Sequence, residues 1–266
     1  MHAFNYHKVS SVADATAKFA ASDDARLLAG GQTLIAAMKM RLSAPADVID
    51  LGGIAELRGI KVESANVTIG AMTTHATVAA SKEVAKAIPA LALLAGSIGD
   101  PMVRNMGTIG GSVANNDPAA DYPAALVGLG ATVITSKRKI AADQFFTGMY
   151  ETALEPGEII ISVSFPVPKR AGYIKFKNPA SRYAMVGVFV AESASGLRVA
   201  ATGAGPCVFR IPEMEKALGK SFTTEALKGI KVPSDNLNTD IHATAEYRAH
   251  LVTVMAQRAV EQALGK

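Results

Sequence analysis

Up to residue 166 the chain alternates between short apolar runs of strand character and amphipathic runs with helical spacing. Turns rich in glycine and polar residues separate these runs, so each element is short. The predicted strands are 25–28, 48–51, 67–71, 131–136 and 158–165. The predicted helices are 11–21, 34–42, 82–98 and 123–129, and Pro89 must kink or split the third of them. Residues 99–121 are rich in glycine and poor in apolar residues, and they carry no predicted element.

The pattern changes after Pro166 and Pro168, which we interpret as a joint between two domains. Runs 173–178, 185–192 and 197–203 have strand character with short turns between them, which predicts an antiparallel meander of three strands. Helical segments follow, and the last, at about 245–264, is amphipathic. Its predicted apolar face carries Tyr247, Leu251, Val254, Met255 and Ala259, while Arg248, His250, Gln257 and Glu261 lie elsewhere. These elements predict an α+β fold with α/β-layered packing and a domain boundary near 166–176.

The composition is that of a globular protein and argues against several classes of function. Of the 266 residues, 49% are apolar and 19% are charged. The formal net charge of +4 is spread along the chain without a run of five Lys or Arg, which argues against nucleic acid binding. The N-terminus lacks the apolar core of a secretory signal, and no apolar stretch reaches the ~20 residues of a membrane span. We therefore expect a cytoplasmic protein without a transmembrane segment.

A single cysteine, Cys207, restricts the chemistry that the chain can perform alone. It excludes an internal disulfide, a four-cysteine zinc site and an iron–sulfur cluster bound only by cysteines of this chain. Cys207 itself is expected to be a small buried residue rather than a nucleophile. The five histidines do not cluster, and neither an H-E-x-x-H nor a G-x-S-x-G motif is present. The sequence therefore predicts no metal site and no catalytic side chain.

Two glycine-rich segments resemble each other, at residues 28–34 and 107–113. Each has a Gly-Gly pair, then one or two small polar residues and an apolar residue. Glycine lacks a Cβ and reaches positive φ, so backbone N–H groups in such loops can converge on an anion. The hydroxyls of Thr33, Thr108 and Ser112 can add donors. Either segment alone is better explained as a tight turn, but the pair favours two loops that hold a pyrophosphate.

Six segments of the chain carry a further indication when they are taken together and in order. They are 27–51, 70–75, 103–121, 155–166, 173–176 and 245–251. These segments resemble the FAD-binding subunits of molybdenum hydroxylases, a family that includes the medium subunits of aerobic carbon monoxide dehydrogenase and the flavin domains of xanthine dehydrogenase. The resemblance covers nearly the whole chain, and the second glycine loop is its most specific part.

The resemblance implies a fold in two domains. Residues 1–170 would form a FAD-binding domain of the vanillyl-alcohol-oxidase (PCMH) type, whose two subdomains divide near 55–60. Residues 171–266 would form a smaller domain with an antiparallel three-stranded sheet and helices.

The resemblance also implies which residues contact FAD, which the family binds in an extended form. The pyrophosphate would lie against Ala29, Gly30, Gly31, Gln32, Thr33 and Leu34, and against Thr108, Ile109, Gly110, Gly111 and Ser112. Asp121 would lie near the adenosine half, although a helix N-terminus before Pro123 explains the same carboxylate. Ile160 or Ile161 would pack near the flavin or the adenine, although at least one of them is expected to be an ordinary core residue. Lys175 would approach the flavin from the second domain, unless it is an exposed strand lysine.

Three further positions matter around these loops. Arg104 and Asn105 flank the second loop and are expected to steady its backbone rather than to touch FAD. His75 is expected at a helix start or on the surface, with a place near the flavin as the alternative. Arg182 departs from the family, which often has an acidic residue at this position. We expect this difference to affect the choice of electron acceptor more than FAD binding.

The reaction that the resemblance implies is divided among three subunits. A molybdenum cofactor subunit oxidises the substrate, a small subunit with two [2Fe–2S] clusters relays electrons, and a FAD subunit passes them to quinone, NAD or oxygen. A chain with one cysteine fits only the third role, within a complex expected to be a dimer of heterotrimers. The organic substrate is bound by another chain, so this sequence does not identify it. The alternative is a stand-alone FAD-dependent oxidoreductase with a related two-loop flavin fold.

Overall fold

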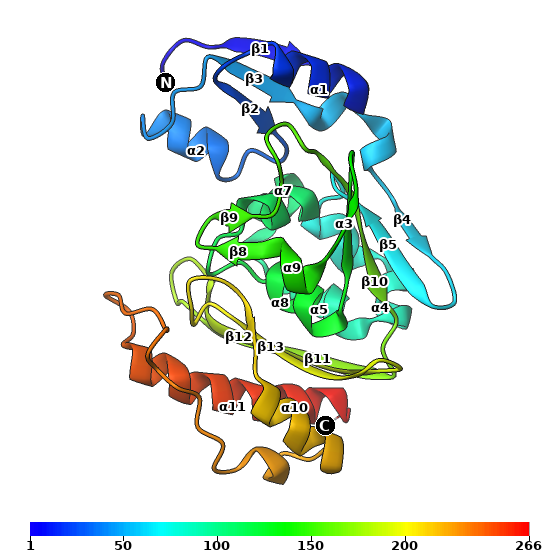
Figure 1. The fold of residues 1–266 in the computed structure, drawn as a ribbon, viewed down its shortest axis with the longest axis vertical. Coiled ribbons are helices and arrows are strands. Elements are labelled where there is room, and N and C mark those ends of the chain that lie inside the picture. The colour runs from blue at the N-terminus through cyan, green and yellow to red at the C-terminus, as the bar shows by residue number, and fades with distance from the viewer. Residues whose placement is uncertain (266) are drawn as a thin grey trace.

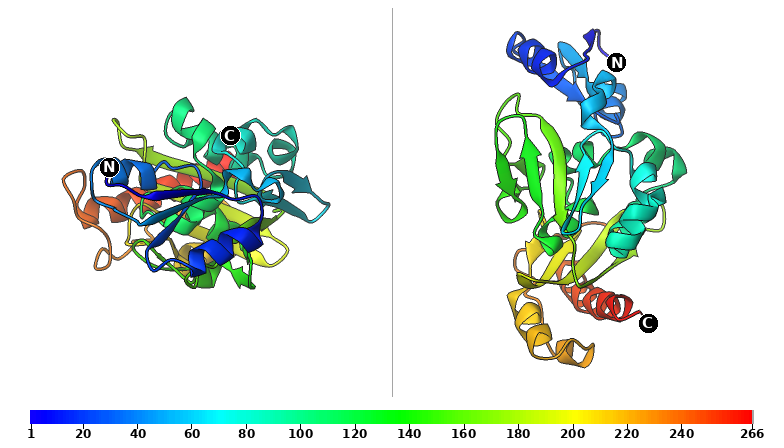
Figure 2. Two further views of the ribbon diagram at one scale, coloured as in Figure 1. Left: turned by 90° about the horizontal axis from the view of Figure 1, so that it is seen from above. Right: turned by 90° about the vertical axis from the view of Figure 1, so that its right-hand side faces the viewer.

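Three sheets, stacked along the long axis of the molecule, organise the chain (Figure 1). The computed structural model describes residues 1–265. A small N-terminal sheet lies at one end, a five-stranded sheet with most of the helices lies in the middle, and a four-stranded sheet backed by the last long helix lies at the other end (Figures 1 and 2). The mixed α+β architecture that the sequence predicts is confirmed.

The N-terminal sheet is parallel, which requires a crossover between successive strands. Its strands are β1 (Asn5–Lys8), β2 (Ala25–Leu28) and β3 (Asp47–Asp50), in the order β1-β3-β2. Helix α1 (Val12–Ala20) connects β1 to β2, and helix α2 (Leu34–Lys39) connects β2 to β3. The hydroxyl of Ser11 caps α1 by accepting a hydrogen bond from the Asp14 N–H at 3.1 Å, as the sequence indicates.

The central sheet is antiparallel, in the order β4-β5-β10-β6-β7. Its strands are β4 (Ile60–Val62), β5 (Asn66–Gly70), β6 (Thr132–Thr135), β7 (Lys139–Ala141) and β10 (Ile160–Pro166), with a small hairpin of β8 (Phe146–Gly148) and β9 (Glu151–Thr152). Its helices are α3 (His75–Ala80), α4 (Lys82–Ala87), α5 (Pro89–Ser97), α6 (Pro101–Met106), α7 (Ile109–Asn115), α8 (Tyr122–Leu129) and α9 (Ala142–Phe145). Short 3-10 turns occur at η1 (Leu51–Gly53), η2 (Ala55–Leu57) and η3 (Glu225–Leu227).

Every residue of α8 is buried, because this helix is covered on all sides.

The C-terminal sheet contains β11 (Arg170–Lys177), β12 (Ala184–Ser193), β13 (Gly196–Thr202) and β14 (Phe209–Arg210). The predicted antiparallel meander of three strands is confirmed, and the two-residue β14 extends it. Strand β12 is buried on both faces. Its Phe189 belongs to the central core, while Val188 belongs to a second core with α10 (Pro212–Lys220) and α11 (Ala245–Ala263). This sheet is therefore held between the central helices and the two C-terminal helices (Figure 1).

The sequence prediction needs correction in the glycine-rich region. Residues 99–121 contain α6 and α7, because Asp100 caps the first and Thr108 caps the second through side-chain oxygens. The predicted helix 82–98 is split in two at Pro89, one of the two effects predicted for this proline, and Pro89 is the first residue of the second helix. Capping residues thus start helices whose apolar pattern is too short to detect.

The predicted apolar face of the terminal helix was also wrong in part. Tyr247 is 44% exposed, whereas Arg248 is only 4% exposed. Its guanidinium donates hydrogen bonds to the carbonyl oxygens of Met185 (2.6 Å) and Gly203 (2.9 Å), and to the Asp240 carboxylate (2.7 Å). A charged residue is buried here because two strand-end carbonyls need donors.

The membrane prediction can be compared with the helices directly. Among residues 1–265, no helix has both the length and the apolar character needed to cross a membrane.

The buried hydrogen bonds of the Arg248 guanidinium should contribute strongly to the stability of the fold. In Arg248→Met, the carbonyls of Met185 and Gly203 lose the guanidinium that donates to them, so we expect a loss of roughly 3 kcal/mol in the free energy of unfolding. Urea unfolding followed by circular dichroism measures this loss. Asp240→Asn is the control and should cost less than about 1 kcal/mol, because that carboxylate is 46% exposed. Equal stabilities of Arg248→Met and the unmodified chain would contradict this account.

Candidate functional site

A cavity of about 730 Å³ is lined by all three parts of the chain. The first glycine loop and α2 contribute from the N-terminal part, and the segments around α6 and α7 contribute from the central part. Residues 158–160 and 180–183 complete the lining. Its size lies within the range that binding sites for organic ligands occupy, about 300–1,000 Å³.

The first glycine loop supplies free backbone donors to this cavity. Residues Ala29, Gly30, Gly31, Gln32, Thr33 and Leu34 all line it. Within residues 1–265, the N–H groups of Gly31, Gln32, Thr33 and Leu34 have no hydrogen-bond acceptor, and the Thr33 hydroxyl makes no capping bond. Gly31 has a φ of +72°, which favours glycine. This loop can therefore donate several hydrogen bonds to an anion.

The second glycine loop contributes space rather than backbone donors. The N–H groups of Ile109 and Gly110 donate to the carbonyls of Thr73 (3.1 Å) and Ala71 (2.8 Å), and the Gly111 N–H donates to the Thr108 hydroxyl (3.2 Å). Thr108, Gly110, Gly111 and Ser112 line the cavity, while Ile109 is fully buried behind its wall. The Ser112 hydroxyl is the side-chain donor that this loop offers to the cavity.

The two loops are in direct contact, and their glycines permit it. A Cβ on Gly30 would collide with the carbonyl oxygen of Met106. A Cβ on Gly111 would lie 3.0 Å from the Thr108 Oγ1 and 3.3 Å from the Ala29 Cβ. Backbone from the N-terminal and central parts thus meets at the wall of one cavity.

Asp121 and Lys175 form a buried ion pair beside the cavity. The Lys175 Nζ lies 2.8 Å from the Asp121 Oδ1, and the Tyr173 hydroxyl donates to the same oxygen at 2.5 Å. The two charged side chains are 4% and 2% exposed, so Lys175 is not an exposed strand lysine. Burial raises the pKa of the Asp121 carboxyl, although Lys175 and Tyr173 oppose that rise. Asp121 is the N-cap residue of α8, as the alternative predicted, but its side chain makes no capping hydrogen bond.

This ion pair bears on the places predicted for its two members. Asp121 is predicted to lie near the adenosine half of FAD and Lys175 near the flavin. Because the two charged groups are 2.8 Å apart, they would contact the same part of an extended dinucleotide, and which part that is stays a prediction. Asp121 lines the cavity, whereas Lys175 reaches the site through Asp121 from β11.

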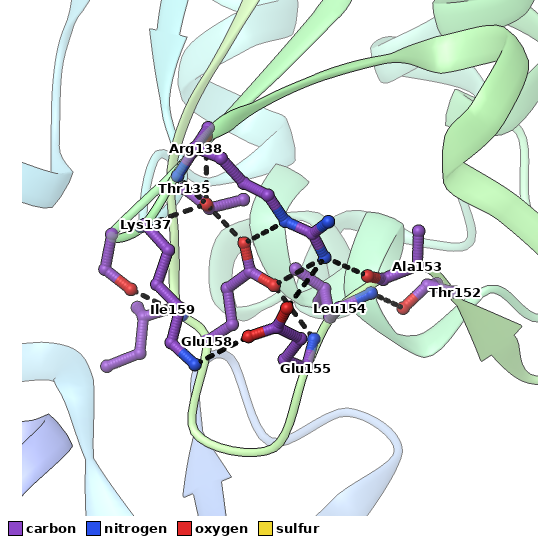
Figure 3. Close-up of polar contacts among 10 residues, drawn as sticks. Thr135, Lys137, Arg138, Thr152, Ala153, Leu154, Glu155, Glu158 and Ile159 are labelled. Atoms are coloured by element: carbon purple, nitrogen blue, oxygen red, sulfur yellow. Dashed lines mark hydrogen bonds and ion pairs between the residues drawn. The ribbon is translucent and has the colours of Figure 1, made fainter.

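The wall at residues 154–160 is held by a buried carboxylate, Glu158 (Figure 3). Arg138 donates to both of its oxygens at 3.1 Å, and the Thr135 hydroxyl (2.6 Å) and the Glu155 N–H (2.8 Å) complete its hydrogen bonds. Burial opposes the charge on Glu158, but these donors outweigh it and lower its pKa to about 2.

The network fixes the two residues that follow Glu158. Ile159 packs in the N-terminal core and Ile160 in the central core, and both line the cavity. Ile161 does not line it. The sequence contains Glu158 in a family-like segment, but only the fold shows that its carboxylate is buried.

His75 is the first residue of α3, as expected, but it is buried rather than on the surface. It is 4% exposed and lines the cavity, and burial followed by the nearby Arg104 charge lowers its pKa to about 4. Arg104 donates to the carbonyls of Ile98 (2.9 Å) and Gly99 (3.2 Å), and Asn105 donates to Pro101 (2.7 Å). Neither lines the cavity, so both brace the backbone as predicted.

Residues 180–183 form the cavity rim that comes from the C-terminal domain. The Asn178 side chain holds this turn by accepting from the N–H groups of Ala180 (2.9 Å) and Ser181 (3.1 Å). Arg182 has a φ of +62°, and Tyr183 is 50% exposed. The sequence indicated that Arg182 departs from the family pattern, but it did not indicate Tyr183, because a single tyrosine in a loop belongs to no motif.

Two other kinds of site, a metal centre and a reactive thiol, can be compared with this cavity. No group of three or more His, Cys, Asp or Glu side chains could hold a metal ion in that part of the chain. Cys207 does not line the cavity, and burial raises the pKa of its thiol, so the unreactive protonated form is favoured.

Glu158 should make stability depend on pH in acid. Its folded pKa of about 2 lies below the ordinary value of 4.5, so its contribution is complete above pH 4.5 and is lost as the pH falls towards 2. We expect Glu158→Gln to be less stable at pH 7 and to lose part of this dependence, as measured by urea unfolding between pH 2.5 and 7. Glu63→Gln, whose exposed carboxylate pairs with Lys61, should keep it. Parallel pH profiles for Glu158→Gln and the unmodified chain would refute this.

Comparison with known proteins identifies the family to which the chain is similar. Residues 2–168 match the family described as "FAD binding domain in molybdopterin dehydrogenase". The chain is 35% identical to the nicotine 6-hydroxylase medium subunit of Paenarthrobacter nicotinovorans, over 98% of this chain and 97% of that protein. It is 37% identical to the carbon monoxide dehydrogenase medium chain of Afipia carboxidovorans, over 98% and 96%. A solved structure of Cu,Mo-CO dehydrogenase in its cyanide-inactivated form matches with a TM-score of 0.90 and 36% identity, over 100% of this chain and 99% of that one.

Proposed function

Because the chain belongs to the family of FAD-binding domains in molybdopterin dehydrogenases, we propose that it takes electrons from a [2Fe–2S] subunit and passes them to an acceptor. Family membership makes it a FAD-binding oxidoreductase subunit of the molybdenum hydroxylase type. Bound FAD supplies the electron-carrying chemistry, and the protein supplies binding, orientation and electrostatics. The observation that carries the proposal is the cavity between the two glycine loops.

The residues of the cavity fit FAD at its most polar part. The free N–H groups of Gly31 to Leu34 and the hydroxyls of Thr33 and Ser112 would hold the pyrophosphate. Gly110 and Gly111 let the second loop pack against Ala71 and Ala29, where a Cβ would be too close, and this packing would hold the loop beside the pyrophosphate. Ile109 would contribute through the backbone of this loop and not through its buried side chain.

Two groups of lining residues guide the orientation that we propose. Ile98, Gly99 and Val103 line the cavity from the segment around α6, and Ile160, Asp121 and the rim 180–183 line it from other segments. We place the adenosine beside the first group and the isoalloxazine ring beside the second. Ile160 offers an apolar surface to a flat tricyclic ring, and Tyr183 in the rim is 50% exposed, so the second group reaches the surface where electrons must enter and leave.

The expected partners follow from what this chain lacks. A chain with one cysteine cannot bind two [2Fe–2S] clusters, so a small iron–sulfur subunit and a large molybdenum subunit would complete the complex. A dimer of such heterotrimers is part of the proposal, as is quinone, NAD or oxygen as acceptor. The division into domains 1–170 and 171–266, with subdomains parting near 55–60, is supported by which residues form each sheet. The cytoplasmic location stays a prediction.

A variant of the purified complex separates this role from substrate oxidation. In Gly111→Val, the larger side chain would strike Thr108 and Ala29, so we expect FAD to be lost. The iron–sulfur centres should still be reduced by substrate, while reduction of the acceptor stops. Visible spectra and acceptor assays measure the three quantities. Gly219→Val is the matched control, because its Cβ would meet only Leu197 at 4.0 Å. Acceptor reduction at the normal rate without bound FAD would refute the proposal, as would a chain that purifies without iron and molybdenum subunits.

Arg182 should tune the electron affinity of the site. A positive charge near the isoalloxazine ring favours the reduced, more negative form of FAD, so Arg182→Asp should make its reduction potential more negative. Potentiometric titration of the FAD-loaded chain measures this. Lys228→Asp makes the same change of charge on an exposed residue away from the cavity and should leave the potential unchanged. An unaltered potential in Arg182→Asp would contradict the placement of the ring beside the rim 180–183.

A further inference from the structure

The imidazole of His75 is a buried polar group without a hydrogen-bond partner in its own protein. Within residues 1–265, no protein group bonds either ring nitrogen, and the Nδ1 is fully buried. A buried polar group in this state is costly unless something satisfies it. Thr73, Thr108 and Glu158, which are as deeply buried, all have protein partners.

The surroundings of His75 leave one direction from which a partner can come. Its ring stands 5.4 Å from the Tyr122 ring, and the Tyr122 hydroxyl is itself buried without a partner. A Cβ on Gly107 would lie 2.6 Å from the His75 Nε2, so this nitrogen lies beside the Gly107 backbone, which lines the cavity. Arg104, the nearby charge, uses its guanidinium on Ile98 and Gly99 and has no acceptor to offer. The cavity remains, and the Nε2 is the ring nitrogen that a ligand there can reach, because the Nδ1 is fully buried.

We propose that His75 is a hydrogen-bonding residue of the FAD site and that its imidazole donates to an oxygen of the adenosine diphosphate half. This inference rests on the proposed orientation of FAD. His75 lies against Gly107, where α6 ends and the second glycine loop begins, on the side of Ile98, Gly99 and Val103. Ribose and phosphate oxygens are the acceptors that an adenosine diphosphate group brings to this place.

The charge state of His75 agrees with such a contact. With a pKa of about 4, the imidazole is neutral at pH 7 and carries one N–H donor and one acceptor nitrogen. A neutral donor can be buried beside Arg104 without placing two positive charges together. The contact therefore adds a directional hydrogen bond to FAD binding without adding a buried charge.

The test compares two replacements of His75 in the full chain after removal of FAD. His75→Phe keeps the ring packing but no donor, and we expect it to bind FAD and ADP about tenfold more weakly. His75→Gln keeps an N–H donor and should recover affinity to within about threefold of the unmodified chain. Quenching of flavin fluorescence measures FAD binding, and calorimetry measures ADP binding. Thermal unfolding by circular dichroism shows that each variant is folded.

The outcomes separate this inference from the proposed function. His250→Phe, which changes a histidine of α11 outside the cavity, should bind like the unmodified chain. If the unmodified chain takes up no FAD, the proposed function itself fails. If it binds FAD and folded His75→Phe binds equally well, only the role of His75 is wrong. Equal losses in His75→Gln and His75→Phe would show that packing, not a hydrogen bond, matters. A loss for FAD with unchanged ADP binding would overturn the assignment to the adenosine half.

Discussion

The close approach of two glycine loops is the constraint on which the rest of this structure depends. One loop belongs to a small parallel sheet and the other to the helices of the central sheet, yet Gly30 lies directly on the backbone of Met106 and Gly107. A Cβ at this point would push the two parts of the chain away from each other. The small sheet is packed further by Ile159 and Met72, which complete its core from the central side. The shape of the cavity thus follows from where two backbones can touch.

The C-terminal sheet is attached to the same cavity by polar contacts that are buried. The Asp121–Lys175 pair joins α8 to β11, and the Thr202 hydroxyl donates to the Ala120 carbonyl at 2.7 Å. A buried ion pair adds little net stability over apolar packing, but removal of one partner is costly. Its effect here is therefore one of position: it fixes where β11 and the neighbouring rim 180–183 stand relative to the central helices.

Much of the fold could be predicted because its elements have clear periodicity. The meander after Pro168 and the five strands predicted in the first half lie within a few residues of where the apolar patterns place them. The short strands β1, β4, β7, β8 and β9 were not predicted, because runs of two to four residues show no clear alternation. The short helices α6 and α7 could not, since each has fewer than two apolar turns and begins with a side-chain cap. Arg248 shows the same limit, because a pattern of polarity does not reveal carbonyls that need a donor.

The features of the site can likewise be divided into those that the sequence predicts and those that it does not. The sequence indicated both glycine loops, Asp121 and Ile160, which line the cavity, because chain order and residue type already mark them. It could not show that Asp121 and Lys175 meet, since the contact joins residues 54 positions apart. Nor could it show that His75 and Glu158 are buried, because burial depends on packing between distant segments.

The two glycine loops differ in how many of their backbone N–H groups have a hydrogen-bond acceptor, and this difference has a consequence for cofactor binding. The N–H groups of Ile109, Gly110 and Gly111 in the second loop have protein acceptors, whereas four N–H groups of the first loop have none among residues 1–265. An anion in the cavity would therefore add hydrogen bonds mainly on the side that the N-terminal part supplies. Binding of the dinucleotide would thus be coupled to the position of the first fifty residues, so the bound cofactor would act as a structural tie between the small sheet and the remainder of the chain.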